Sequence, residues 1–405
     1  MTHQIDSTVD IEQFNSEVAE ELIRLLDWWA EKMPDLQHGG FYGRIDSFGK
    51  LYPKADKAII LNSRILWSFS AAGNLAPSER YRQKADRAFT YICQYFVDQQ
   101  EGGVYWMLNH LGEVVQARKQ VYAQAFTIYA FAEYYLYTDN DEALDAALDI
   151  FDLLEQHSLD TTHDGYFEAF GRDWRPITDL RLSDKDANEA KTMNTHLHVL
   201  EAYTTLFRVS NNERVGAALK RLVKCFLDRF VDANTGHLHL FFDEQWVLKS
   251  DIVSYGHDIE ASWLLMEAVE LLDDPSLLKQ AEDLALRLAR ATLSEGVDED
   301  GAICNEIQED GVLDTDKHWW PQAEAVVGFW NAWQLSKEEA YQEAAWNTWG
   351  YIKQSIIDEE HGEWHWGRTA DHQLMDKQNK AGPWKAPYHN SRMCIEMIKR
   401  TLITL

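Results

Sequence analysis

The sequence of 405 residues has few cysteines, few positive charges and no long apolar runs, and each shortage excludes a class of protein. Its four cysteines stand far apart without a CxxC pair, which argues against a disulfide framework or a zinc site. Only 38 Lys and Arg oppose 67 Asp and Glu, and a net charge of −29 repels nucleic acid and anionic lipid. No 18-residue stretch lacks charges, as a membrane span would. The N-terminus has no basic and apolar leader, so we expect a cytoplasmic protein.

A short segment of glycine followed by aromatic and polar residues recurs six times along the chain. Its marker glycines lie 61 to 71 residues apart, at Gly40, Gly103, Gly165, Gly236, Gly301 and Gly362. After each glycine, apolar and polar residues alternate as in a short strand. A period of this size predicts a repeat architecture. No linker interrupts it, so we expect one domain over residues 1–405, with a flexible N-terminus at 1–10.

The stretches between these segments have helical periodicity, with apolar residues at helical spacing and Gly, Pro, Asp or Asn at the joins. Twelve helices are expected at residues 11–32, 58–75, 81–99, 120–138, 141–157, 188–209, 212–231, 256–272, 276–293, 317–336, 338–357 and 389–404. A strand-like segment follows each odd-numbered helix and precedes each even-numbered one. Six such units predict an all-α fold, an (α/α)6 barrel with short β-hairpins at one end. The irregular stretch 172–187 is expected to form a surface loop near the mouth.

Unusual polar and aromatic residues gather at the starts of the even-numbered helices. They are Arg64, Trp67, Tyr122, Gln124, Asn194, His196, His198, His257, Glu260, Trp319, Trp320, Glu324, Trp384, His389 and Arg392. If the even-numbered helices form the inner ring, their N-termini meet at one end of the barrel, where the helix dipoles favour a developing oxyanion. Each of these residues alone has a structural explanation, but their convergence favours a functional site.

Helical spacing indicates which of these side chains share a face. His257 and Glu260 are three residues apart, so the carboxylate can orient the imidazole, and Asn194 lies four residues before His198. His196 points elsewhere.

Tryptophans beside Asn, Gln, Tyr and Arg suit a carbohydrate, whose C–H faces pack on aromatic rings. Histidines suit acid/base work near neutral pH. No GxGxxG, GxxxxGK[ST] or HExxH motif occurs, so neither a nucleotide cofactor nor a metal is expected.

Six stretches of the chain resemble the N-acylglucosamine 2-epimerase superfamily, and most of all its cellobiose 2-epimerases. They are KAIILNSRILW at 57–67, GGVYWM at 102–107, KTMNTHLH at 191–198, SYGHDIEASWL at 254–264, WWPQAEAVVGF at 319–329 and GPWKAPYHNSRMC at 382–394. The stretches at 254–264 and 382–394 are the most specific. One departure is Ala386, where the resemblance predicts cysteine, and it bears on which sugar is bound.

The resemblance implies an (α/α)6 barrel without a cofactor, and it implies roles for particular residues. His257 and His389 would be the acid/base pair, Glu260 would support His257, and His198 would assist ring opening. The substrate-binding residues would be Arg64, Tyr122, Asn194, Trp320, Trp384 and Glu324.

The expected function is that of an isomerase that inverts C2 of the reducing-end glucose of cellobiose-type β-1,4 disaccharides. A second sugar would need additional surface at the mouth, for which the candidates are Trp174, Asp179, His239, Trp364 and Trp366. The only expected partner is a small sugar, and the expected oligomeric state is a monomer or weak dimer.

Three alternatives remain open on the sequence. A mannose 2-epimerase or an aldose–ketose isomerase would use the same enediolate on free monosaccharides. A glycoside hydrolase would need two carboxylates, with Glu260 and Glu324 as candidates. A non-catalytic binding protein would leave the converging histidines unexplained.

Overall fold

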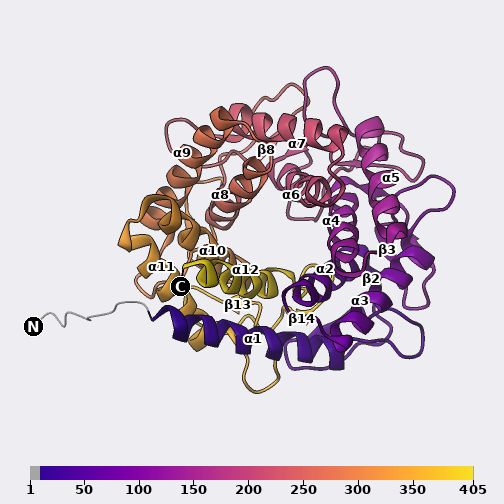
Figure 1. Ribbon diagram of the computed structural model, residues 1–405, viewed down its shortest axis with the longest axis horizontal. Coiled ribbons are helices and arrows are strands. Elements are labelled where there is room, and N and C mark those ends of the chain that lie inside the picture. The colour runs from indigo at the N-terminus through magenta and orange to yellow at the C-terminus, as the bar shows by residue number, and fades with distance from the viewer. Residues whose placement is uncertain (1–9, 405) are drawn as a thin grey trace, which may run out of the picture.

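Two concentric rings of helices form the molecule, which is known from a computed structural model that describes residues 10–404 (Figure 1). Most of the predicted flexible segment 1–10 therefore lies outside the described residues. The inner ring consists of α2 (Ile59–Leu75), α4 (Val121–Thr138), α6 (Met193–Ser210), α8 (Tyr255–Glu270), α10 (Trp319–Ser336) and α12 (Tyr388–Thr404). These helices contact one another in a closed circle, from α2 round to α12 and back. The predicted (α/α)6 barrel is confirmed.

The outer ring consists of α1 (Ile11–Lys32), α3 (Glu79–Tyr91), α5 (Asp141–His157), α7 (Glu213–Cys225), α9 (Pro275–Ala291) and α11 (Glu339–Tyr351). Four of these helices continue into a π-helical turn, at η1 (Ile92–Phe96), η2 (Phe226–Phe230), η3 (Thr292–Gly296) and η4 (Ile352–Ile356). The outer helices have a polar outward face, whereas the inner ones, enclosed on all sides, bury nearly every residue of their first three turns.

The predicted helix bounds agree with the structure to within two residues, except at one start and at the π-helical ends. The helix expected at 188–209 begins only at Met193, because Lys191 and Thr192 form a strand instead. Apolar periodicity does not distinguish a π-helical turn from the α-helix that it continues, so the four π-helical turns were not predicted.

Six small sheets join neighbouring repeats. In each, the strand before an inner helix pairs antiparallel with a strand of the next repeat. The pairs are β2 (Lys57–Ala58) with β3 (Met107–Leu108), β5 (Lys119–Gln120) with β6 (Ala169–Phe170), β7 (Lys191–Thr192) with β8 (Phe241–Phe242), β9 (Val253–Ser254) with β10 (Glu306–Ile307), β12 (Lys317–His318) with β13 (Gly367–Arg368), and β14 (Asn379–Ala381) with β1 (Ile45–Asp46). Two sheets gain a third strand, β4 (Val114–Gln116) or β11 (Leu313–Asp314). The β14–β1 pair closes the ring.

Five of the six repeats share an ion pair between a buried lysine of this strand and an aspartate of the preceding turn, which is buried in four of the pairs and 41% exposed in the fifth, at Asp298. The lysine in each strand contacts an aspartate that also accepts backbone N–H groups in its turn. The pairs are Lys57–Asp35, Lys119–Asp98, Lys191–Asp160, Lys317–Asp298 and Lys380–Asp358, with N–O distances of 2.5 to 3.1 Å. In the remaining repeat Val253 occupies the position of the lysine.

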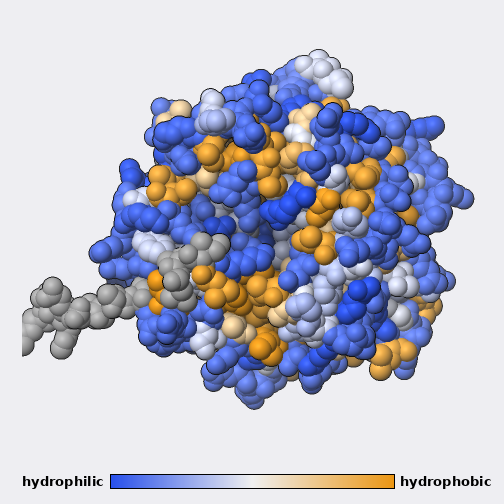
Figure 2. Space-filling model, in the orientation of Figure 1, coloured by the Kyte–Doolittle hydropathy of each residue, from blue (hydrophilic) through white to orange (hydrophobic). Residues whose placement is uncertain are grey.

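The surface seen in Figure 2 is mostly hydrophilic, with hydrophobic residues gathered around the central hollow. Within residues 10–404, no helix combines the length and apolar character that crossing a bilayer requires.

Candidate active site

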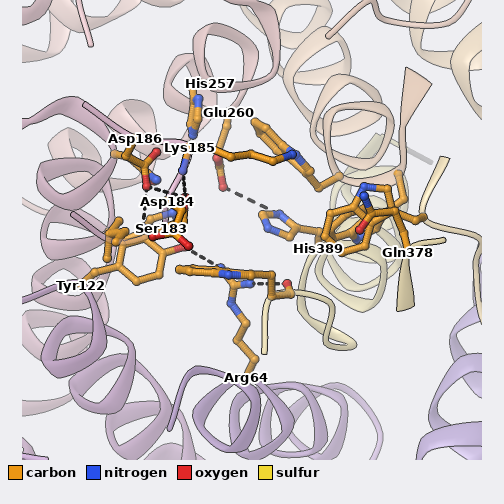
Figure 3. A pocket seen from close by; sticks show the side chains of 17 residues that line it. Arg64, Tyr122, Ser183, Asp184, Lys185, Asp186, His257, Glu260, Gln378 and His389 are labelled. Carbon is orange, nitrogen blue, oxygen red and sulfur yellow. Dashed lines mark hydrogen bonds and ion pairs between the residues drawn. The ribbon is translucent and has the colours of Figure 1, made fainter. Parts of the chain in front are cut away.

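A cavity of about 470 Å³ lies where the N-termini of the inner helices meet, which is the end of the barrel predicted from the sequence. Side chains from opposite sides of the ring point into it, with Arg64 facing His257 and Glu260, and Tyr122 facing His389 (Figure 3). Its walls are formed by Arg64, Tyr122, Leu182, Ser183, Asp184, Lys185, Asp186, Asn194, His198, His257, Glu260, Trp319, Trp320, Trp366, Gln378, Trp384 and His389. A volume of this size falls within the range of small-molecule sites.

Nine of the ten predicted site residues line this cavity, and Glu324 does not. Glu324 was expected to bind substrate, but its side chain is 1% exposed and lies behind His389. Its Oε1 accepts a hydrogen bond from Nδ1 of His389 at 2.7 Å, and its Oε2 accepts one from Nε1 of Trp263 at 3.1 Å. Glu324 lies one helical turn deeper than Trp320, so it orients the histidine and does not reach the cavity.

His257 is held by a different partner from the one that helical spacing indicated. Its Nδ1 lies 2.8 Å from Oγ of Ser254, whereas the predicted partner Glu260 accepts a hydrogen bond from Arg392. Glu260 also lies 4.0 Å from Nδ1 of His389. The expectation that Glu260 supports His257 is therefore wrong, because an arginine from another inner helix takes its carboxylate.

Arg392 is the centre of a buried charge network below the cavity. Its guanidinium contacts the carboxylates of Glu201, Glu260 and Glu324, which come from three different inner helices. Ligand atoms of Glu260, Glu324 and His389 lie within 4.8 Å of one another, which is a spacing that could hold a metal ion. Arg392 already donates to both carboxylates, so it supplies the positive charge that this cluster needs.

His198 is oriented by Glu201, which the sequence analysis did not single out. Nδ1 of His198 lies 3.0 Å from Oε2 of Glu201, and the other carboxylate oxygen contacts Tyr388 and Arg392. The spacing of three residues between His198 and Glu201 on α6 is the same pattern that was noticed for His257 and Glu260, and it could have identified this pair.

Arg64 presents its guanidinium to the cavity from α2. Its two terminal nitrogens donate to the hydroxyl of Tyr122 at 2.7 Å and to the carbonyl of Trp384 at 3.0 Å. The guanidinium also lies 4.4 Å from the ring centroid of Phe126, which fixes its plane. Among the described residues, the buried Oδ1 of Asn194 has no hydrogen-bond partner, so this wall of the cavity offers an acceptor to a ligand.

Two histidines of the cavity, His257 and His389, have a lowered pKa. Burial, together with the charge of His198, lowers the pKa of His257 to about 3. Burial and the positive charges of Arg64 and Arg392 also lower the pKa of His389. Burial and the charge of Glu324 raise the pKa of Glu260 to about 7, in spite of Arg392. Near pH 7 the two imidazoles are thus unprotonated, and the ring of Trp320 lies 4.8 Å from His257 and 5.7 Å from His389.

The mouth of the cavity differs from what was expected for a second sugar. Of the five candidate residues only Trp366 lines the cavity, where it packs on Trp319 at 4.3 Å between ring centroids. Trp174 stacks on His157, and Trp364 is fully buried with its Nε1 donating to Glu21. The remaining two candidates, Asp179 and His239, lie away from the cavity.

The stretch 172–187 does reach the mouth, and residues 182–186 form one wall. Ser183 caps a short turn in this wall by bonding to Asp186 at 2.8 Å. These residues and Gln378 were missed because irregular segments have no periodicity that predicts a direction for a side chain. Ala386 is buried and is not part of the lining.

Comparison with known proteins gives consistent matches over nearly the whole chain. The family model described as N-acylglucosamine 2-epimerase matches residues 40–392. A cellobiose 2-epimerase of Bacteroides fragilis is 46% identical over 389 residues, which are 96% of this chain and 99% of the relative. One of Ruminococcus albus is 41% identical over 387 residues, or 95% of this chain and 98% of the relative. The structure of a cellobiose 2-epimerase from Bacillus thermoamylovorans superposes with a TM-score of 0.92 at 39% identity, covering 96% of this chain and 100% of that one.

Proposed function

The chain belongs to the N-acylglucosamine 2-epimerase family, and on that premise we propose that this isomerase is a cellobiose 2-epimerase. It would invert C2 of the reducing-end glucose of cellobiose and give glucosylmannose. The observation that carries this proposal is the pair of histidines, His257 and His389, which line one sugar-sized cavity from different helices with their pKa values lowered.

Ring opening comes first, because a C2 hydrogen is not acidic in the cyclic sugar. His198, whose Nδ1 bonds to Glu201 and which lines the cavity, would move the proton of the C1 hydroxyl to the ring oxygen. The open chain has a C1 aldehyde, beside which the C2 hydrogen becomes acidic.

Proton transfer at C2 then follows. One imidazole takes the C2 proton, and the electron pair of the C–H bond forms the C1–C2 double bond of an enediolate with its negative charge on O1. Arg64 stabilises this oxyanion, and the N-terminal dipoles of the inner helices act in the same sense. The other imidazole, which takes up a proton from water once the negative charge of the enediolate lies beside it, delivers that proton to the opposite face of C2. The aldehyde re-forms, the ring closes, and the first imidazole gives its proton to water. The direction of the reaction decides which of His257 and His389 is the base.

The positions of Ser254 and Glu324 support the proposed roles of His257 and His389 in proton transfer. Each binds Nδ1 of one catalytic histidine, which leaves Nε2 of that ring for the substrate. The glycoside hydrolase alternative has no such support, because Glu324 lies behind His389 and Glu260 is bound to Arg392.

Incubation with cellobiose in D2O, followed by proton NMR, tests the proposal. Solvent deuterium should appear at C2 of glucosylmannose with the unaltered protein. It should be absent with His257→Ala and with His389→Ala, while His239→Ala, a substitution away from the cavity, should keep the activity. Free glucose would instead identify a hydrolase, and a ketose product would identify an aldose–ketose isomerase. Full activity of either variant would refute the assignment of His257 and His389 as the acid/base pair.

We also propose a cytoplasmic location and a monomer or weak dimer. The four cysteines are unpaired and three of them are buried, as is usual in a reducing compartment.

A further inference from the structure

His237 lies outside the cavity, in the only repeat of the described chain that lacks the buried lysine of the Lys–Asp pairs. The turn aspartate of this repeat, Asp232, is present and accepts the backbone N–H of Asn234 as its counterparts do, but Val253 stands where the other repeats have lysine. The hairpin after this turn instead holds a buried histidine, His237, which is 4% exposed and pairs with carboxylates other than Asp232.

The ring of His237 is held between two carboxylates. Its Nδ1 lies 2.7 Å from Oδ2 of Asp258, and its Nε2 lies 3.3 Å from Oε2 of Glu295. The titratable groups that face it are Asp258 and Tyr255 from α8 and Glu295 from η3, with the Tyr255 ring centroid 5.8 Å away. Burial acts to lower the pKa of His237, but the two carboxylates outweigh it and raise the pKa above its usual value. An acceptor at each ring nitrogen is the arrangement that a doubly protonated imidazole requires.

Asp258 connects this pair to the proposed catalytic machinery, because it directly follows His257 on α8. Its other oxygen accepts the backbone N–H of Leu238 at 2.9 Å, which fastens the hairpin to the first turn of the helix. The hydroxyl of Ser254, the N-cap residue, bonds to His257 and makes no cap hydrogen bond to the helix. The first turn of α8 therefore depends on Asp258, and Asp258 depends on the charge of His237.

We propose that His237 is a positioning residue whose protonated ring, clamped between Asp258 and Glu295, holds the first turn of α8 and thereby places His257 in the cavity. This inference rests on the proposed function. A lysine keeps its charge over the whole physiological range, whereas a histidine loses its charge as the pH rises through its pKa. Below that pH the clamp is intact. Above it the contact with Glu295 and the ion pair with Asp258 are lost, so turnover decreases on the alkaline side while the barrel stays folded.

Glu295→Gln tests the proposal with little risk to folding, because Glu295 is half exposed. Removing this carboxylate lowers the pKa of His237, so the alkaline decline of kcat with cellobiose should move to lower pH. KM should stay unchanged, since Glu295 does not line the cavity. The matched control is Glu299→Gln, an exposed position four residues further along, which should leave the profile unaltered.

A second measurement is independent of activity. In protein labelled with 15N-histidine, the ring signals absent from His237→Gln identify His237, and their titration should move to lower pH in Glu295→Gln. His237→Gln itself should reduce kcat about tenfold or more through misplacement of His257. An unshifted kcat profile in Glu295→Gln, or a His237 ring that is already neutral at pH 6, would overturn the proposal. Failure to epimerise any sugar would refute the proposed function. The titration of the His237 ring would still show whether that ring is protonated between Asp258 and Glu295.

Discussion

Replacing Glu324 by glutamine should reduce turnover strongly while leaving sugar binding almost intact. The carboxylate accepts hydrogen bonds from His389 and from Arg392, both at 2.7 Å, and is shielded from water. A glutamine keeps the shape but loses the negative charge, and its amide nitrogen cannot accept. With the amide oxygen in place of Oε1, Trp263 loses its acceptor, and with the amide nitrogen there, His389 and Arg392 lose theirs. In either orientation His389 loses the negative charge that stabilises its protonated ring.

The magnitude follows from the kind of bond that is lost. A hydrogen bond to a charged group contributes about 1.5–3 kcal/mol. At about 1.4 kcal/mol for each factor of ten, kcat should fall by roughly 10- to 150-fold if the bond acts mainly in the transition state. Because Glu324 does not touch the cavity, KM for cellobiose should change by less than about threefold.

Steady-state kinetics on cellobiose, with the melting temperature measured in parallel, provide the test. The melting temperature should fall modestly, because Arg392 keeps two of its three carboxylates. Glu360→Gln, at a position that is 84% exposed, is the control and should change neither quantity. An increase of KM without a loss of kcat would mean that Glu324 binds the sugar directly, as the sequence had predicted. Unchanged kinetics in a folded variant would refute the role of the carboxylate altogether.

Three further predictions concern the cavity. Since burial lowers the pKa of His257 to about 3 and that of His389 as well, both bases stay neutral in mild acid, and the acid limb of kcat/KM should lie below pH 6.5; a midpoint at or above 6.5 would contradict this. Dialysis against EDTA should leave turnover unchanged because Arg392 supplies the positive charge between Glu260 and Glu324, and a loss restored by one divalent ion would reverse that interpretation. Trp366→Ala should lower kcat/KM for cellobiose about tenfold through loss of ring stacking, with little effect on glucose; equal losses for both sugars would place Trp366 at the reacting ring.

Sequence periodicity predicted the barrel and the end at which the site lies, because both depend on local patterns that repeat. Asn194 and His198 are four residues apart on α6, and both line the cavity. His196, two residues from each, points away, and its Nε2 accepts the backbone N–H of Tyr166. Spacing along one helix therefore identified the correct face.

Partners from different helices could not be predicted in this way. Arg392 reaches from α12 to Glu260 on α8, and His389 reaches to Glu324 on α10. These contacts depend on how the ring closes, and spacing along one helix does not determine that. The single physical indication was charge balance, since several buried carboxylates at one end of a barrel require a buried cation.

When the inner helices are aligned on their first residue, the polar residues that hold the hairpins and the polar residues that line the cavity occupy different positions. At the fourth position, Gln124, Asp258 and Gln322 each accept a backbone N–H from the hairpin of their own repeat, as His196 does. Positions two and six lie on the opposite face, and the cavity residues found there are Tyr122, Asn194, Trp320, His389, Arg64, His198 and Glu260. Glu324, at position six of α10, lies behind His389.

His257 stands at the third position and departs from this rule. Its neighbour Asp258 holds the hairpin at position four, while Ser254 turns the imidazole into the cavity. A polar residue at position four of an inner helix is therefore expected to stabilise the fold. A substitution at position four should change turnover only in α8. There positions three and four are both ionisable, and Asp258, which holds the hairpin, directly follows the proposed catalytic residue His257.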